Sequence, residues 1–323
     1  MTEFSDVVVT GVGFCTALGD DPWAAMQRGE TGVAENEELV RLPHTTAAVV
    51  ERIDLRAWLK RRKDRKLMAR PAQLALSAAG QALTSWSGET DDLGLYLGVG
   101  REPGDDGESE AALVAAQSEG RLDSQRVAGR CRDLYPPLLP LKTLPNMALA
   151  HIAIHLDVRG ENGAWSGDAA AGLTALRAGI WSIRENRCAA AVVVASDSWV
   201  STGAVRDLIR MSGGTPIPPP GEAGVALLIE SAASATVREA AVLGCVDTAE
   251  AGAQRAREGS HHSFLGRCNA ADGLMAVALS IVGRASNRWV TAQEPGQPIV
   301  GVRVHVSSTN ACYAPTSGSG LHG

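Results

Sequence analysis

The chain has 323 residues, of which 45% are hydrophobic, so it can bury a sizeable core as one large domain or as two fused halves. Its formal net charge of −6 gives no reason to expect a nucleic-acid partner, and no apolar run is long enough to cross a bilayer. The six cysteines are scattered without metal-type spacing, which predicts a reduced, cytosolic compartment. Acidic residues precede the first apolar run, so we expect no signal peptide.

The N-terminal part of the chain alternates predicted strands with predicted helices. Residues 7–13 are a β-branched run closed by glycines, which indicates a buried strand. A helix is predicted over residues 22–28, with a proline at its start, where the missing N–H costs least. Apolar side chains at helical spacing predict an amphipathic helix over residues 71–83, and residues 93–99 form the next strand. This alternation favours an α/β fold with a parallel or mixed sheet.

Ahead of that amphipathic helix, residues 59–70 carry a dense run of positive charge. Most runs of this kind are the solvated face of a helix, and that is the simplest interpretation here. The charged positions are Lys60, Arg61, Arg62, Lys63, Arg65, Lys66 and Arg70.

The centre of the chain predicts a strand that turns sharply into a helix. An apolar run over residues 148–156 is followed by a glycine turn, and Trp165 and Ser166 end a strand that we expect to be buried. Residues 170–183 then form a helix that is apolar nearly all round. Acyl-transfer enzymes often place a nucleophile at such a turn, where the helix N-terminus stabilises negative charge. Residues 167–171 contain neither cysteine nor serine, so nothing in this turn can attack.

The later part of the chain continues the alternation more weakly. Residues 189–195 are an uninterrupted apolar run, the pattern of a strand buried on both faces. Further strands are predicted over residues 223–230, 242–247 and 302–306, and a helix over residues 274–282. Residues 314–323 are rich in glycine and serine, and we expect them to be a disordered tail.

The central stretch resembles the centre of a β-ketoacyl-acyl-carrier-protein synthase. In that family a K-T-L-P-N-M loop and a G-H-I-A-I-like segment, followed by R-G-P-N, lead to S-T-A-C-x-S-G-L. Residues 142–147 match the loop, and residues 151–154 with Arg159-Gly160 match the segment that follows. Ser166 and Gly172-Leu173 set the register of the last motif. In that register the nucleophilic cysteine of the family falls on Ala169.

The resemblance covers most of the chain and implies a thiolase-like α/β fold, in which two related halves pack face to face. It implies an N-terminal ketosynthase-like half over residues 1–235 and a C-terminal half over residues 236–313, before the tail. The C-terminal half is shortened, because the family has a much longer segment after Asp247, which carries an A-H-G-T-G-T strand end that has no counterpart here.

Catalysis in the family needs one cysteine and two histidines, and none of them is retained. The cysteine position is Ala169, and the first histidine is lost with the missing segment. The family pattern S-x-K-x-x-x-G-H matches from Ser260, with His262 in place of the lysine and Arg267 in place of the second histidine. An arginine stays charged and cannot act as a neutral imidazole. We therefore expect no catalytic residues, no cofactor and no condensing activity of the chain alone.

The resemblance then implies a subunit of the chain-length-factor type. Such a subunit pairs with an active β-ketoacyl synthase and shapes its acyl tunnel in type II polyketide, aryl-polyene or fatty-acid-like biosynthesis. The expected partners are that synthase and an acyl carrier protein, with no membrane partner. By the same resemblance the charged run helps to dock the acidic carrier through Lys60, Arg61, Arg62, Lys63, Arg65 and Lys66. The synthase interface is expected at Met147, His151, Ala164, Trp165 and Ser166.

Several alternatives stay open on the sequence alone. The chain could be a divergent acyltransferase that uses Cys268 or Ser166 as nucleophile, or a homodimeric scaffold that binds carrier protein or acyl ligand. A free cysteine is more often a small buried hydrophobe, and Trp165 could equally be a core residue of one subunit. The neighbouring histidines 261 and 262 have no acidic or cysteine ligand close in sequence, so no metal site is expected.

Overall fold

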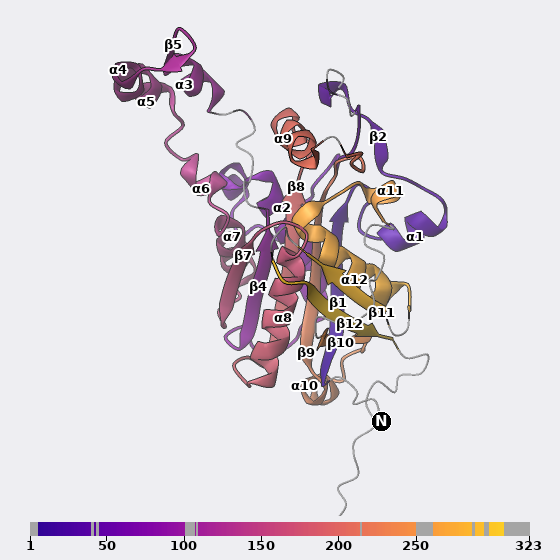
Figure 1. Ribbon diagram of the computed structural model, residues 1–323. Coiled ribbons are helices and arrows are strands. Elements are labelled where there is room, and N and C mark those ends of the chain that lie inside the picture. The colour runs from indigo at the N-terminus through magenta and orange to yellow at the C-terminus, as the bar shows by residue number, and fades with distance from the viewer. Residues whose placement is uncertain are drawn as a thin grey trace, which may run out of the picture.

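The computed structural model describes residues 6–39, 42, 45–100, 107, 109–213, 215–249, 261–285, 288–293 and 297–306. Within them an eight-stranded sheet forms the middle layer, in the order β11-β12-β10-β1-β9-β8-β4-β7 (Figure 1). Its strands are β1 (Val7–Thr16), β4 (Leu93–Val99), β7 (Asn162–Ser166), β8 (Ala190–Ser198), β9 (Glu222–Ser231), β10 (Gly244–Ala249), β11 (Arg288–Ala292) and β12 (Val300–His305). Strand β4 pairs in parallel with β7 and β8, whereas the other neighbours are antiparallel, which confirms the expected mixed sheet.

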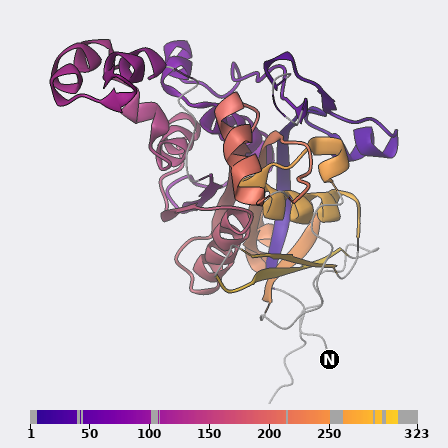
Figure 2. The same cartoon turned by 45° about the horizontal axis from the view of Figure 1, so that its top comes forward.

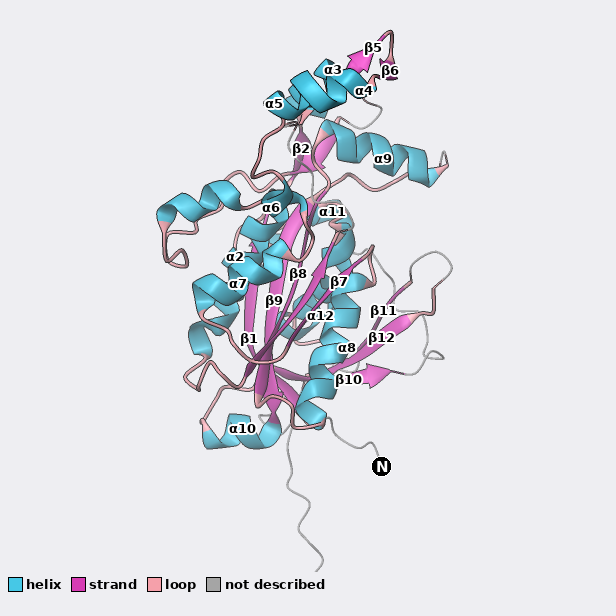
Figure 3. Cartoon of the chain, turned by 90° about the vertical axis from the view of Figure 1, so that its left-hand side faces the viewer, coloured by secondary structure: helices cyan, strands magenta, loops and turns pink. Residues whose placement is uncertain are grey.

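Helices cover both faces of this sheet, as the view along its edge shows (Figure 3). On one face, α2 (Arg70–Ala82) and α7 (Met147–Leu156) bury Leu74 and Ile152 against the sheet. On the other face, α8 (Ala171–Arg184) and α12 (Asp272–Val282) bury Leu176 and Leu274. None of the helices in the described part of the chain is long and apolar enough to span a membrane.

The remaining elements are short. The other helices are α1 (Pro22–Gln27), α3 (Glu110–Ala115), α4 (Ser124–Arg126), α5 (Arg132–Leu134), α6 (Pro140–Thr143), α9 (Thr202–Ser212), α10 (Ala232–Val237) and α11 (His262–Leu265). Two small hairpins pair β2 (Val33–Glu35) with β3 (Thr46–Ala48) and β5 (Gln117–Ser118) with β6 (Arg121–Leu122). The 3₁₀ segments are η1 (Glu37–Leu39), η2 (Arg62–Leu67), η3 (Leu83–Ser85) and η5 (Asn269–Ala271), and η4 (Val127–Cys131) is a π-helical turn.

Small residues let helix α2 pack directly on the backbone of the sheet. A methyl group on Gly13 of β1 would lie 2.0 Å from the carbonyl oxygen of Ala78. A methyl group on Gly224 of β9 would lie 2.2 Å from the carbonyl oxygen of Leu74. Only glycine fits at these two contacts, because a real Cβ atom cannot approach an oxygen so closely. The chain, with few aromatic side chains, thus fills its core by close approach of helix and strand.

Strand β7 differs from the sequence-based expectation. A buried strand was predicted, but β7 lies at the edge of the sheet and pairs with β4 alone among the described strands. Its residues are alternately exposed and half-buried along the strand. The prediction was wrong on burial because an edge strand has a neighbour on one side only, which five residues of sequence cannot reveal.

The C-terminal part of the chain extends this sheet rather than building a separate one among the described residues. Strand β10 pairs with β1, β12 with β10, and β11 with β12, all antiparallel. The domain boundary expected at residue 235 falls inside α10. Residues 250–260, where the sequence predicts a shortened connection, and the predicted tail at residues 314–323 lie outside the described residues.

A helical arm projects from the body of the molecule. It comprises residues 110–143, from α3 to α6, and stands away from the sheet in two views (Figures 1 and 2). Several large apolar side chains on it face solvent, with Val114 at 64% and Leu122 at 73% exposure. The other exposed apolar residues of the arm are Leu113, Val127, Leu134, Tyr135, Leu138 and Leu141. Scattered apolar residues are ordinary on a surface, but such a concentration on one arm indicates an interaction site.

Candidate functional site

The turn between β7 and α8 lies where the sequence motif places the nucleophile of the family, and it contains no nucleophile. The amide of Gly167 donates to the carbonyl of Val99 at 3.0 Å, and the amide of Ala171 donates to the carbonyl of Asp168 at 3.0 Å. Ala169 is half-buried between these two contacts and presents only a methyl group. Acyl transfer through this position therefore has no attacking atom.

The segment that would carry the second catalytic histidine packs against the same turn. A methyl group on Gly273 would lie 3.0 Å from the carbonyl oxygen of Ala169, so the start of α12 touches the turn. Just before it, the Arg267 amide donates to the Pro219 carbonyl at 2.7 Å, and its own carbonyl accepts from the Gly221 amide at 2.9 Å. The fold thus brings together the two regions that the resemblance pairs, with an alanine and an arginine at the key positions.

A buried polar network that the sequence did not predict lies between these regions. The Asn269 amide donates to the carboxylate of Asp197 at 3.2 Å and approaches that of Asp168 at 3.5 Å. Asp197 also accepts from the Trp199 indole N–H at 2.8 Å and from the amide of Ser198 at 2.9 Å. Burial raises the pKa of Asp197 to about 6, although these hydrogen bonds favour its charged form. The one signal in the sequence was an aspartate that closes an otherwise apolar strand.

The two alternative nucleophiles are poorly placed for acyl transfer. Cys268 is fully buried, and its thiol donates to the carbonyl of Leu265 at 3.4 Å. Burial, with the nearby Asp272 carboxylate, raises the pKa of this thiol well above its ordinary value, so a reactive thiolate is disfavoured. The Ser166 hydroxyl donates to the carbonyl of Gly100 at 3.1 Å, which is a structural contact.

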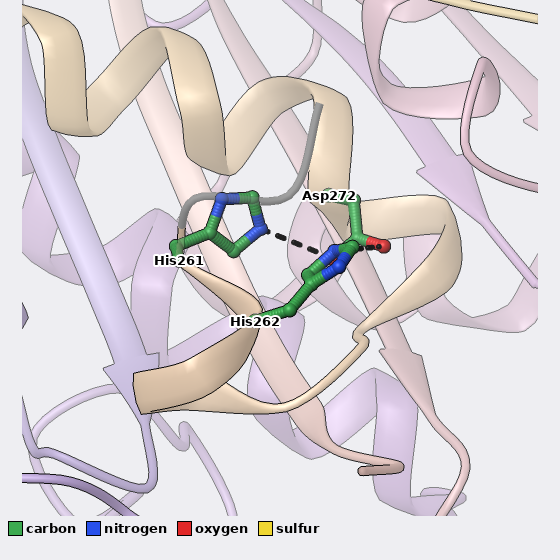
Figure 4. A group of neighbouring side chains, drawn as sticks. All are labelled: His261, His262 and Asp272. Atoms are coloured by element: carbon green, nitrogen blue, oxygen red, sulfur yellow. Dashed lines mark hydrogen bonds and ion pairs between the residues drawn. The ribbon is translucent and has the colours of Figure 1, made fainter. Parts of the chain in front are cut away.

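Two histidines and an aspartate form a cluster beside this site (Figure 4). His261 Nε2 lies 3.3 Å from Asp272 Oδ1, and His262 Nε2 lies 3.1 Å from Asp272 Oδ2. Burial opposes the charge on Asp272, but the two imidazoles outweigh it and hold its pKa well below the ordinary range. The sequence offered no acidic group close to the histidine pair. The first residue of α12, Asp272, supplies one eleven residues after His261.

The residues expected at a subunit interface fall into two groups. Ala164 and Ser166 are exposed on the edge strand, and Met147 is half-buried at the start of α7. His151, by contrast, is 6% exposed, and its ring nitrogen lies 3.2 Å from the carbonyl oxygen of Leu67. Trp165 is half-buried and stacks near Tyr96, with ring centroids 6.2 Å apart. His151 and Trp165 thus pack within this chain, and the free surface is formed by their neighbours.

Two residues of the basic run pair with carboxylates outside the pocket that the rest of the run lines, and Arg70 both lines this pocket and pairs with the buried Glu222. The Lys60 ammonium lies 3.4 Å from Asp157, and the Arg61 guanidinium lies 2.9 Å from the buried Asp64. The other members line an open pocket of about 840 Å³, formed by Arg62, Lys63, Arg65, Lys66, Met68, Arg70, Gln73 and Lys142. Lys142 joins this pocket from a distant part of the sequence, from which no docking residue was predicted.

Comparison with known families decides the family of the chain. The family model "Beta-ketoacyl synthase, N-terminal domain" matches residues 4–217. The chain belongs to the β-ketoacyl synthase family. This confirms the resemblance found in the sequence motifs. No match was found among curated proteins.

Solved structures with a similar fold include ketosynthases and a ketosynthase/chain length factor. One belongs to the AntDE:AntF complex, described as a type II PKS acyl-carrier protein in complex with its ketosynthase bound to the hexaketide. It shares 13% sequence identity with this chain at a TM-score of 0.69, and the match covers 94% of this chain and 100% of that one. The ishigamide ketosynthase/chain length factor has 17% identity and a TM-score of 0.69, covering 93% and 99%. A β-ketoacyl synthase from Burkholderia phymatum STM815 has 18% identity and a TM-score of 0.59, covering 77% and 65%. These likenesses confirm the thiolase-like α/β fold.

Proposed function

We propose that this chain is a non-condensing ketosynthase-like subunit of the chain-length-factor type. It pairs with an active β-ketoacyl synthase and helps to shape the acyl tunnel of that partner. The observation that carries the proposal is the methyl group of Ala169 at the nucleophile position of a turn whose register is set by Ser166 and Gly172-Leu173. Arg267 supports it, because its guanidinium cannot replace the neutral imidazole of the family. The buried Cys268 does not supply a substitute nucleophile.

The proposed setting is a cytoplasmic type II polyketide, aryl-polyene or fatty-acid-like pathway. The described relatives include a ketosynthase in complex with its acyl-carrier protein and a ketosynthase/chain length factor, which supports a carrier and a synthase as partners. Residues 1–235 supply the ketosynthase-like half with the turn, and residues 236–313 supply a shortened second half.

The proposed pairing surface combines the edge strand, α7 and the arm. Strand β7 exposes Ala164 and Ser166, and α7 exposes Ile154 at 55%. The arm at residues 110–143 adds the apolar side chains described above. Obligate interfaces are large and apolar, on the order of 2,000 Å² or more, and the exposed apolar side chains of these elements fit an interface of that kind. A chain that lacks the nucleophile but exposes apolar elements suited to pairing is best explained as a subunit that acts through assembly with its partner.

The isolated chain should accept no acyl group and form no β-ketoacyl product. Incubation with acylated and malonylated carrier, followed by intact-mass spectrometry, should leave the mass of this chain unchanged, because Ala169 offers no attacking atom. The synthase partner, added as a positive control, should gain the acyl mass. An acyl adduct on this chain that is lost with Cys268→Ala or Ser166→Ala would favour the acyltransferase alternative.

We propose that the basic pocket docks the acidic carrier protein. Lys63 and Lys66 are exposed at its rim, whereas Lys60 and Arg61 already pair with carboxylates of this chain. The docking contribution therefore falls mainly on the pocket residues. Exposed charges steer and orient a partner of opposite sign, and salt screens them.

Reversing two charges at this rim should weaken carrier binding. We expect the Lys63→Glu/Lys66→Glu variant to lose at least about tenfold in affinity at low salt, measured by calorimetry or anisotropy. Added salt should have a similar effect on the unmodified chain. The control is Arg52→Glu/Arg56→Glu, which alters two exposed arginines outside the pocket and should leave affinity nearly unchanged. Equal affinity of the rim variant and the parent would show that the run is only a solvated surface.

A further inference from the structure

The cluster of His261, His262 and Asp272 has the geometry of a metal site. His261 lies directly before α11, His262 begins it, and Asp272 begins α12. The three donor atoms lie within 4.8 Å of one another. Figure 4 shows both imidazole rings turned toward the carboxylate of Asp272. The N-terminal ends of α11 and α12 thus bring three possible metal ligands close together.

The distances fit a tetrahedral ion. Zinc binds histidine nitrogen at about 2.0–2.1 Å and carboxylate oxygen at about 2.0–2.2 Å, so neighbouring ligand atoms in a tetrahedral site lie roughly 3.3 Å apart. His261 Nε2 lies 3.3 Å from Asp272 Oδ1 and His262 Nε2 lies 3.1 Å from Asp272 Oδ2, so each imidazole meets its own carboxylate oxygen at about this spacing.

One of these donors is unsatisfied in the structure. His262 Nε2 is buried and makes no hydrogen bond, although a carboxylate oxygen lies 3.1 Å away. A nitrogen lone pair that faces an anionic oxygen is repelled unless a cation or a proton lies between the two. A bound metal ion satisfies both atoms at once, because each donates a lone pair to it.

The surroundings support the ligands as well. The Cys268 amide donates to Asp272 Oδ1 at 2.9 Å, which holds the carboxylate in orientation. His261 is 3% exposed and Asp272 is 8% exposed, whereas the His262 side chain is 18% exposed and marks the open side. Three protein ligands on an enclosed site with one open side leave a fourth position for water.

We propose that His261, His262 and Asp272 bind one divalent transition-metal ion, with zinc preferred. Two imidazoles and one carboxylate suit zinc, whereas calcium and magnesium favour all-oxygen ligand sets. The ion joins the start of α11 to the start of α12, beside the turn of Ala169. The inference goes beyond the proposed function, since neither pairing nor carrier docking requires a metal.

The test uses the full-length protein, purified without a polyhistidine tag, in the complex if the chain requires its partner. After removal of metal by a chelator, we expect Zn²⁺ to bind in calorimetry with one equivalent per chain and to raise the thermal unfolding midpoint. Mg²⁺ should do neither. Co²⁺ as a probe should give the visible absorption of a nitrogen- and oxygen-bound ion.

The variants locate the ion. Loss of a supporting contact alone can cost 10–100-fold in metal affinity, so His262→Ala should cost at least about 100-fold. His262→Cys keeps a zinc ligand and should retain binding, which separates ligand loss from misfolding. The control His305→Gln removes a half-buried histidine on β12, outside the cluster, and should bind as the parent does. Absence of saturable Zn²⁺ binding, or equal affinity in His262→Ala, would overturn the proposal and leave a hydrogen-bonded histidine–aspartate cluster.

Discussion

Replacing Ala164 with glutamate should abolish the complex between this chain and its synthase partner while the chain itself stays folded. Ala164 lies in the middle of β7, is exposed, and pairs in register with Leu97 of β4 on one side only. An edge strand presents free backbone N–H and C=O groups, which a partner strand can satisfy. A buried, unpaired carboxylate at such a junction costs about 2–5 kcal/mol, so affinity should fall at least about 30-fold.

The measurement is co-expression with the synthase encoded beside it, followed by light scattering on a sizing column. The parent should give a stable one-to-one complex, and expressed alone it should be poorly soluble or form a makeshift homodimer. The control Val237→Glu places the same charge on α10, where the side chain is 87% exposed, and should leave the complex intact. A well-behaved monomer that ignores every co-encoded synthase, or an Ala164→Glu complex as tight as the parent's, would contradict the pairing proposal.

Removing Arg70 should destabilise the chain by about 3–5 kcal/mol, since it leaves a buried carboxylate without its charge partner. Glu222 is fully buried at the start of β9, and the Arg70 guanidinium donates to its two oxygens at 2.6 and 2.9 Å. The Val50 amide and the Ser198 hydroxyl also donate to this carboxylate, each at 2.8 Å. These neutral donors hold the carboxylate in place but cannot balance its charge.

Chemical denaturation of Arg70→Ala measures this cost, and the double variant Arg70→Ala/Glu222→Gln should recover part of it, because no charge then stays buried. The matched control is Arg56→Ala, which breaks an exposed pair with Asp54 and should change stability by less than about 1 kcal/mol. If Arg70→Ala were no less stable than Arg56→Ala, the buried pair would not be the contact that ties α2 to β9.

Local patterns in the sequence were sufficient to predict most of the long helices and strands of the fold. The β-branched run that opens the chain and the apolar run before Asp197 became β1 and β8, because short apolar runs rich in valine favour strands buried in a sheet. The register of Ser166 and Gly172-Leu173 placed Ala169 in the turn before α8, and the structure puts it there. Turns and motif spacing depend on neighbours in the chain, so one sequence is enough to find them.

What the tertiary structure decided depends on residues far apart in the chain. Strand β7 was expected to be buried, and only the order of the whole sheet reveals that it is an edge. The sequence could not show which residues of the basic run form ion pairs. Lys60 and Arg61 pair with Asp157 and Asp64 because the fold brings these carboxylates close to them. The contacts of the histidine pair with Asp272, and of Asn269 with Asp197, form only because the residues around the start of α12 pack against the sheet. Charges and hydrogen bonds act over a few ångströms of space, whatever the separation in sequence, and the packing of helices on the sheet sets those distances.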